Sequence, residues 1–225
     1  MNENWPQAYK DGFQDFYGRD FVVSPHVLIP RPETEMAVDA VLNLAGAQYL
    51  PGVKPATARI SRGAKILDVG TGSGVIAVTL ALELPEAEVS AVDLSENALA
   101  VARENAAKLG AEVKFWRSDL LDNVDGDFDV IVANLPYVDV KWGWLDKEAL
   151  AAEPSLALYA PNDGLALIFK LIDQIAEKKC TKYVVLEADL CQHRRIRKYA
   201  RSKNFEHIET RGLQLLFLVG GEGEI

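Results

Sequence analysis

From residue 64 to the end, short apolar runs rich in β-branched residues alternate with stretches whose apolar side chains recur at helical spacing. Strands separated by helices predict right-handed crossovers and a parallel sheet covered on both faces. The last two apolar runs have no helix between them, so they predict a hairpin that adds one antiparallel strand. We therefore expect an α/β fold with a seven-stranded, mostly parallel sheet and helices on both faces. The predicted strands are 66–69, 89–93, 113–115, 128–132, 183–186, 205–209 and 213–219, and the predicted helices are 73–84, 95–110, 165–175 and 190–202.

The segment before this alternation has a different character. Residues 1–32 are rich in aromatic residues and prolines, and Tyr17–Asp20 has the composition of a turn inside a small β-hairpin. The prolines that follow keep the chain extended, and a helix is expected to begin near Pro32. Residues 47–63 carry no periodicity and are interpreted as a loop. We expect two parts: a β-hairpin with an extended segment at 1–32, and one main domain at 33–225.

Bulk properties narrow the class of protein. The 225 residues are enough for one sizeable core. The net charge of −9 argues against binding of nucleic acid through broad positive charge. No apolar run approaches the roughly 20 residues that span a bilayer, and Cys180 and Cys191 have neither redox nor zinc spacing. We therefore expect a reduced, cytoplasmic protein without a metal site, present as a monomer or a weak dimer.

The first predicted strand of the main domain runs directly into a glycine-rich turn. Glycine at alternate positions tolerates unusual dihedral angles and lets backbone approach a ligand without a Cβ in the way. Asp93 ends the next strand, where its carboxylate could accept hydrogen bonds from both hydroxyls of a ribose. The alternative is a turn and an aspartate that only connect elements. We interpret the motif as a nucleoside site with these candidate residues: Asp68, Gly70, Thr71, Gly72, Ser73, Gly74, Asp93 and Leu94.

The spacing of the glycines bears on which nucleoside binds. A dinucleotide fingerprint requires glycine at the position of Val75, and the phosphate loop that ends in Lys followed by Ser or Thr is absent. S-adenosylmethionine has no phosphate and needs a sugar clamp, an adenine slot and room for a sulfonium. Asp119 follows the third strand, where it could reach the adenine amino group while Leu120 packs on the ring. The alternative for Asp119 is a turn residue, but the pattern as a whole favours S-adenosylmethionine over NAD.

The second motif, Asn134-Leu135-Pro136-Tyr137, follows the strand at 128–132. The Asn134 side-chain oxygen and a neighbouring backbone carbonyl can accept both hydrogens of an amide or an exocyclic amine. Pro136 stiffens the turn, and Tyr137 can stack on a flat substrate group. In isolation the tetrapeptide would be an ordinary proline turn. Beside the glycine motif we interpret Asn134, Leu135, Pro136 and Tyr137 as the substrate-binding residues, with Asn134, Pro136 and Tyr137 catalytic.

Such a site suits methylation of a nitrogen. An amide nitrogen is a weak nucleophile because its lone pair is delocalised, as the rotational barrier of about 18–20 kcal/mol shows. Holding the reacting atoms at attack distance can contribute about 7–11 kcal/mol. Acceptors aimed at the NH2 hydrogens would also stabilise positive charge that grows on the nitrogen. No strong base is required, which agrees with histidines that all lie outside both motifs.

The order of these motifs resembles that of the HemK/PrmC-like release factor glutamine N5-methyltransferases, which are Rossmann-like class I enzymes that use S-adenosylmethionine. The resemblance covers about residues 13–190. It depends on these stretches: Ile29–Glu35, Asp68–Gly74, Ala91–Asp93, Asn134–Tyr137, Glu153-Pro154 with Leu156–Leu158, and Asp163–Leu165. It implies that the glycine motif, Asp93, Leu120 and Asn134 contact S-adenosylmethionine. It also implies that the Asn134 motif holds the glutamine of the Gly-Gly-Gln loop in a peptide-chain release factor.

Three features depart from the family's pattern. Leu135 replaces the first proline of the usual Asn-Pro-Pro-Tyr, and Asn-Leu-Pro-Tyr also resembles the box of rRNA adenine dimethyltransferases. The acceptor chemistry is kept, since Leu135 still supplies a carbonyl. The family's helical N-terminal recognition domain has no counterpart in the sequence, and residues 210–214 lack the usual acidic-to-arginine pattern.

We therefore carry three hypotheses. The first is glutamine N5-methylation of a release factor. The second is adenine N6-methylation of RNA or DNA, which the Leu135 variant favours and the acidic net charge opposes. The third is a catalytically inactive module that binds S-adenosylmethionine.

Two other features have both a functional and a structural interpretation. Trp142 and Trp144 lie in the irregular insert at 134–161, where they could form a substrate lid or a local hydrophobic cover. The basic stretch at 194–203 could contact a release factor or a ribosomal surface, although a solvated helix face is the stronger interpretation.

Overall fold

The computed structural model describes residues 5–47, 60–143 and 150–220. Most of the predicted loop at 47–63, and Trp144 of the insert, lie outside the described residues. The main sheet has seven strands in the order β5-β4-β3-β6-β7-β9-β8, and β9 is antiparallel to both of its neighbours. The predicted mostly parallel sheet with a terminal hairpin is therefore confirmed. The strands are β3 (Lys65–Val69), β4 (Glu88–Asp93), β5 (Val113–Arg117), β6 (Phe128–Ala133), β7 (Thr181–Glu187), β8 (Phe205–Arg211) and β9 (Gln214–Val219).

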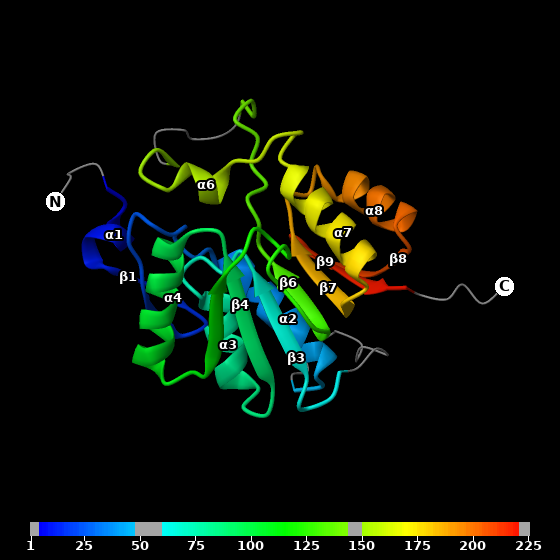
Figure 1. The fold of residues 1–225 in the computed structure, drawn as a ribbon. Coiled ribbons are helices and arrows are strands. Elements are labelled where there is room, and N and C mark those ends of the chain that lie inside the picture. The colour runs from blue at the N-terminus through cyan, green and yellow to red at the C-terminus, as the bar shows by residue number, and fades with distance from the viewer. Residues whose placement is uncertain (1–4, 48–59, 144–149, 221–225) are drawn as a thin grey trace.

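Helices cover both faces of the main sheet, as Figure 1 shows. On one face α2 and α3 pack against β3, β6 and β7, with α4 beside α3; on the other face lie α7 and α8. The positions of all five helices agree with the apolar periodicity of the sequence. Their bounds are α2 (Glu35–Leu44), α3 (Val75–Glu83), α4 (Glu96–Leu109), α7 (Ala166–Lys178) and α8 (His193–Ser202).

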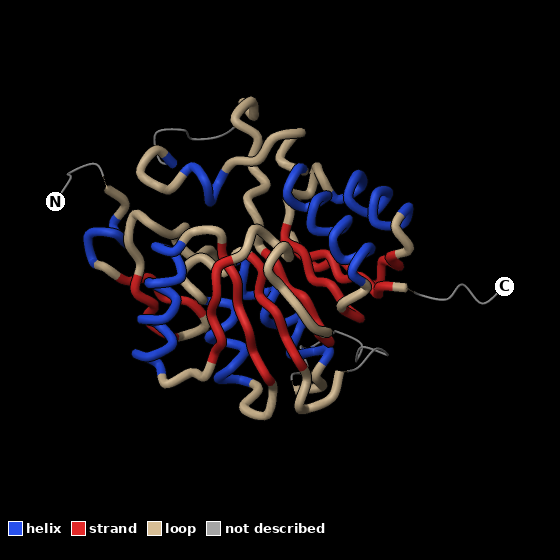
Figure 2. The backbone as a smooth tube through the Cα atoms, in the orientation of Figure 1, coloured by secondary structure: helices blue, strands red, loops and turns tan. Residues whose placement is uncertain are grey.

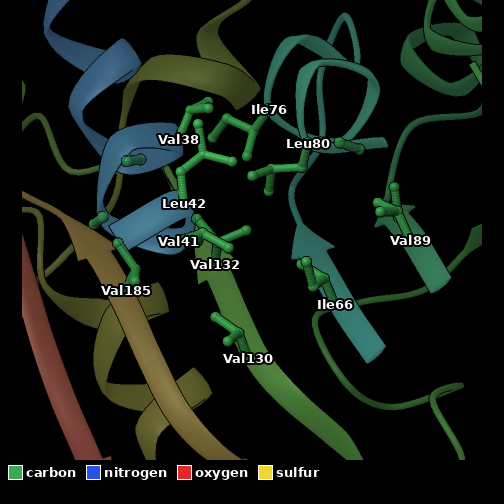
Figure 3. Close-up of a cluster of buried hydrophobic side chains, with 14 of the residues drawn as sticks. Val38, Val41, Leu42, Ile66, Ile76, Leu80, Val89, Val130, Val132 and Val185 are labelled. Atoms are coloured by element: carbon green, nitrogen blue, oxygen red, sulfur yellow. The ribbon is translucent and has the colours of Figure 1, made fainter. Parts of the chain in front are cut away.

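Strand β6 shows how the two halves of the core are built. Val130 and Val132 point into the cluster under α2 and α3, whereas Ile131 and Ala133 point into the cluster under α7 and α8. Figure 3 shows Val132 next to Val41 of α2, with Val130 further along the same strand. Successive side chains of a strand point to opposite faces, so a strand that is buried on both faces reads as continuously apolar. Each buried valine or isoleucine side chain contributes about 1.5–3 kcal/mol through burial.

The N-terminal segment forms a small unit beside α4 (Figure 1). The predicted hairpin is present as β1 (Phe13–Phe16) and β2 (Arg19–Val22), preceded by a helix that the sequence did not predict, α1 (Gln7–Asp11). The buried Asn105 of α4 anchors this hairpin: its Oδ1 accepts from the Val22 N–H at 2.7 Å, and its Nδ2 donates to the Val22 carbonyl at 3.0 Å. Asn105 lies on the buried face of α4 with Ala98, Val101 and Ala102, but its role there is polar. The domain boundary at residue 32 stays a prediction.

The carboxyl ends of the parallel strands meet at one edge of the sheet. The irregular stretch after β6 rises from this edge and carries the short helix α6 (Ser155–Leu158), as Figure 2 shows. The extended segment after the hairpin leads into η1 (Pro32–Thr34) and then α2. Within the described residues, no helix is both long enough and apolar enough to cross a membrane.

Candidate functional site

A cavity of about 300 Å³ lies at the carboxyl ends of β3, β4 and β6. The stretch from Pro25 to Arg31 and residues around α6 complete its wall. The structure brings both sequence motifs to this cavity, although Asp68, Gly74 and Tyr137 lie outside its lining. The predicted site residues that line it are Gly70, Thr71, Gly72, Ser73, Asp93, Leu94, Asp119, Leu120, Asn134, Leu135 and Pro136.

The glycine turn is tied to the end of the neighbouring strand. The backbone N–H groups of Gly70 and Thr71 both donate to the Val92 carbonyl, at 2.8 and 3.0 Å. Gly70 has a φ of +76°, and a Cβ built there would lie 2.9 Å from Cδ2 of Leu135. Only glycine meets both demands without strain. The glycine turn and the Asn134 motif are therefore packed directly against each other.

Asp68 lies beneath the glycine turn and is fully buried. Its Oδ2 accepts from the Thr71 hydroxyl at 2.7 Å and from the Ala77 N–H at 3.3 Å, while its buried Oδ1 has no hydrogen-bond partner. Burial raises the pKa of Asp68 to about 7. Asp68 thus joins the turn to the first turn of α3, and its predicted contact with the cofactor stays a prediction.

Asp93 ends β4 and holds the loops on either side of it. Its Oδ2 accepts from the Gly72 N–H and its Oδ1 from the Ser95 N–H, both at 2.9 Å. Burial raises the pKa of Asp93, and hydrogen bonds from backbone N–H groups oppose that rise. Each carboxylate oxygen has capacity for a further hydrogen bond, so the side chain can still accept from two hydroxyl groups.

Asp119 and Leu120 form the cavity wall after β5. Asp119 accepts from Nζ of Lys170 at 2.8 Å in a partly exposed ion pair. Leu120 adopts a φ of +51°, which is uncommon for a residue with a Cβ and marks a tight turn. The structure therefore supports the turn interpretation of Asp119 and also leaves it at the cavity surface.

Asn134 is held by a residue that is distant from it in the sequence. Its Nδ2 donates to Oγ1 of Thr34 at 2.9 Å, although the two residues are 100 positions apart. This hydrogen bond leaves Oδ1 of Asn134 as the group available to a ligand. Thr34 is buried in η1 and also lines the cavity. Thr34 belongs to the Ile29–Glu35 segment of the family resemblance, which did not predict this contact.

A second cavity of about 200 Å³ adjoins the first, and the two share Asn134, Leu135 and Pro136 in their walls. Tyr137 lines this second cavity, and its hydroxyl donates to Oε1 of Glu187 at 3.3 Å. The Tyr137 carbonyl accepts from Nε2 of Gln192 at 2.8 Å. Asn134, Leu135 and Pro136 thus form part of the partition between two adjoining cavities, together with Leu28, Arg31 and Ala157, which also line both.

Two further residues without a predicted role, Glu153 and His26, contribute to the walls around this site. Glu153, in the insert, is buried and accepts from the Ile29 N–H at 3.0 Å and from Arg31. Its Oε2 and Oε1 therefore join the insert to the extended segment before η1. His26 lines the larger cavity although it lies outside both sequence motifs. The Glu153-Pro154 resemblance was the one sequence signal that pointed to this contact.

The charges around the larger cavity bear on which ligand it suits. Of the lysines and arginines in the described part of the chain, Arg31 alone lines the cavity, and its guanidinium is paired with Glu153. Such a wall offers little to a phosphate group, which usually binds arginine, lysine or a run of free backbone N–H groups. In the same residues no group of three or more His, Cys, Asp or Glu side chains could hold a metal ion.

Comparison with known proteins places these features in a family context. The sequence matches the family described as Methyltransferase small domain over residues 53–145. A release factor glutamine methyltransferase of Koribacter versatilis is 45% identical over 175 residues, which cover 76% of this chain and 58% of that protein. This chain therefore spans less than two thirds of that relative's length.

In two further comparisons the alignment covers a larger share of the protein that is compared with this chain. A release factor glutamine methyltransferase of Neisseria gonorrhoeae is 39% identical over 211 residues, which cover 91% of this chain and 71% of that protein. The crystal structure of a methyltransferase from Pyrococcus furiosus aligns with a TM-score of 0.60 at 19% identity and covers 91% of each chain. The structural match shows the shared fold, whereas the sequence matches show to which family the chain belongs.

Proposed function

Because this chain belongs to the release factor glutamine methyltransferase family, we propose that it methylates the side-chain amide nitrogen of a glutamine in a peptide-chain release factor. The observation that carries the proposal is the partition formed by Asn134, Leu135 and Pro136. One cavity holds the cofactor and the other holds the acceptor side chain. The Asn134 motif then contacts both partners at the point where they meet.

S-adenosylmethionine is the cofactor of this class of methyltransferases. When bound, it supplies a methyl carbon activated by a sulfonium. The larger cavity fits such a group because Asp93 can accept from the ribose hydroxyls and Gly70 leaves room for close approach. Asp68 supports this cavity from beneath, where its Oδ2 holds the Thr71 hydroxyl of the glycine turn. The paired state of Arg31 agrees with a cofactor that carries no phosphate.

The chain's own residues account for the reactivity of the acceptor. Oδ1 of Asn134 and a carbonyl of the same motif accept the two amide hydrogens, so the nitrogen is fixed in one orientation. These acceptors stabilise positive charge that develops on the nitrogen, and fixed geometry can contribute about 7–11 kcal/mol. Tyr137 closes the acceptor cavity on the side of Glu187. Its hydroxyl is not a base, because burial and the neighbouring Glu187 raise its pKa.

The remaining proposals follow from this activity. The partner is a release factor, and the net charge of −9 disfavours nucleic acid as the direct substrate. A substrate used in translation, together with two free cysteines, supports a cytoplasmic location. We expect the chain to act as a monomer or a weak dimer.

Transfer of a labelled methyl group tests the proposal. The chain is incubated with S-adenosylmethionine labelled in the methyl group, a release factor and, separately, total RNA or DNA. We expect label on the glutamine of the Gly-Gly-Gln loop and none on a release factor in which that glutamine is alanine. Label only on nucleic acid would replace the proposal with adenine methylation. Cofactor binding by calorimetry without transfer to any substrate would leave an inactive binding module.

A further inference from the structure

A buried carboxyl group lies behind the Asn134 motif, and three side chains that can donate hydrogen bonds converge on it. Glu187, at the end of β7, is 2% exposed. It accepts from the Tyr137 hydroxyl at 3.3 Å and from Nε2 of Gln214 at 2.8 Å, and the Thr34 hydroxyl lies next to it as a third donor. Burial raises the pKa of Glu187, and the three donors oppose that rise. Because all three neighbours can donate, Glu187 serves them as the hydrogen-bond acceptor.

This arrangement determines the direction of the hydrogen bonds at Thr34. A threonine hydroxyl has one proton to donate and lone pairs that accept. Next to Glu187 the hydroxyl directs its proton to that acceptor, so Oγ1 accepts from its other neighbour. That neighbour is Asn134, and of its two amide groups only Nδ2 can donate to Oγ1. The oxygen and nitrogen of an asparagine have nearly the same shape, so packing alone does not decide between them. The hydrogen-bond chain does.

We propose that Thr34 is a positioning residue. Its hydroxyl donates toward Glu187 and accepts from Nδ2 of Asn134, and this turns the Asn134 carbonyl oxygen toward the substrate nitrogen that receives the methyl group. The inference rests on the proposed function, because only an acceptor with N–H groups requires that oxygen. In the opposite orientation Asn134 would direct its own NH2 group at the NH2 group of the substrate. Two donors would then face each other, and a buried donor without a partner destabilises the complex.

A matched set of variants separates the hydroxyl of Thr34 from its shape. Thr34→Val keeps the branched shape and removes the hydroxyl, Thr34→Ala removes both, and Thr34→Ser keeps the hydroxyl. With a release factor as substrate, we expect kcat/KM to fall by about 10- to 100-fold in the valine and alanine variants. The serine variant stays within about threefold of the wild type. The cofactor Kd, measured by calorimetry, also stays within about threefold in all three variants.

A second measurement does not depend on activity. In ¹⁵N-labelled protein, the side-chain amide signal of Asn134 is assigned by its loss in Asn134→Asp. We expect its protons to exchange slowly with solvent in the wild type and in Thr34→Ser, and at least about tenfold faster in Thr34→Val, where the hydrogen bond is lost.

The outcomes of the two measurements are distinct. Equal activity of the valine and serine variants, or equal protection of the Asn134 amide in the wild type and Thr34→Val, would overturn the positioning role. A fall in cofactor affinity as large as the fall in kcat/KM would also overturn it, because that pattern indicates general damage to the site. If the wild type itself transfers no label to the release factor, the proposed function has failed, while the amide exchange still reports on Thr34.

Discussion

The two halves of the site are built in different ways. The half proposed to bind the cofactor, called the cofactor half, is Asp68–Gly74 with Asp93. It is held by contacts that are short in sequence: Thr71 to Asp68 over 3 residues and Gly72 to Asp93 over 21. The half proposed to bind the methyl acceptor, called the acceptor half, is Asn134–Tyr137 with Thr34 and Glu187. It is held over 100 residues between Asn134 and Thr34 and 50 between Tyr137 and Glu187. The first half is mostly backbone geometry, and the second is a set of side chains supplied by distant elements.

This difference teaches which property belongs to which half. A turn made of glycines and one strand-ending carboxylate can form on many sheets of this kind, because it needs only two adjacent strands. The acceptor half requires β7, β9 and η1 to be packed together before Asn134 has its partner. We therefore expect that cofactor affinity depends on local sequence, whereas acceptor chemistry depends on the completed fold.

The largest expected effect comes from removing the shared acceptor. Asn134→Ala should lower kcat/KM by about 10²- to 10³-fold, the usual loss when one oriented polar group is removed from a reaction site. The matched change in the cofactor half is Asp93→Ala, which should weaken cofactor binding by about 10- to 100-fold through loss of charge-assisted hydrogen bonds. Steady-state kinetics with a release factor and calorimetry with the cofactor measure the two effects. The distinction between the halves fails if both variants lose cofactor affinity and turnover equally.

The next effect is a loss of stability from adding a Cβ at Gly164, which packs against the Tyr137 backbone in the acceptor half. A Cβ on Gly164 would overlap the Tyr137 carbonyl oxygen and lie 2.6 Å from its carbonyl carbon, whereas a Cβ on Gly126 would meet nothing within 4 Å. Both glycines have positive φ, +80° and +93°. Gly164→Ala should therefore lower the free energy of unfolding by about 1–3 kcal/mol more than Gly126→Ala does. Urea denaturation of the two variants measures the difference, and equal values would contradict the overlap.

Titration of Asp68 tests the cofactor half. Its pKa is raised from 3.8 to about 7 in the folded protein, so between these values the folded chain holds a proton that the unfolded chain has lost. The free energy of unfolding should thus fall as pH rises through this window, by up to about 1.4 kcal/mol per pH unit, and level off above it. Urea denaturation of the wild type and Asp68→Asn at several pH values isolates the effect, since other groups cancel in the difference. A difference that stays constant with pH would show that Asp68 keeps an ordinary pKa.

The smallest effect belongs to the exposed rim of the larger cavity. Lys170→Met removes the partly exposed ion pair with Asp119 and should change the free energy of unfolding by less than about 1 kcal/mol. Lys114→Met is the control, because its ion pair with Glu88 is longer, at 3.7 Å, and more exposed. Denaturation at low and high salt measures both. A larger loss in Lys170→Met that persists at high salt would make Asp119 part of the buried framework.

That Gly70, Gly72 and Asp93 meet at one cavity could be predicted from the sequence because the signals are local, whereas their contact with the cofactor stays a prediction. Gly70 and Gly72 follow one strand and Asp93 ends the next, so the rule that strand ends share one edge was enough to bring them together. Asp68 shows the limit of that rule: the structure places it below the turn and outside the cavity lining, so its contact with the cofactor stays a prediction. Proximity in sequence does not say toward which side a carboxylate points.

The acceptor half could be located from the sequence but not explained by it. Asn134 and Tyr137 were identified, yet nothing in a sequence periodicity joins Asn134 to Thr34 or Glu187 to Gln214. Asn105 lies at helical spacing from the apolar residues Ala98, Val101 and Ala102, and only the structure shows its three hydrogen bonds. Contacts of this kind depend on how loops and distant elements meet, which local propensity does not encode.

Asn105 has a mechanical consequence. The amide that grips both backbone groups of Val22 also donates to the carbonyl of Ser73 at 2.9 Å. One side chain thus joins the N-terminal hairpin to the glycine turn that lines the larger cavity. Displacement of the hairpin would disturb Asn105 and therefore also its hydrogen bond to the Ser73 carbonyl. A change in this peripheral hairpin would thus alter the glycine turn at the centre of the protein.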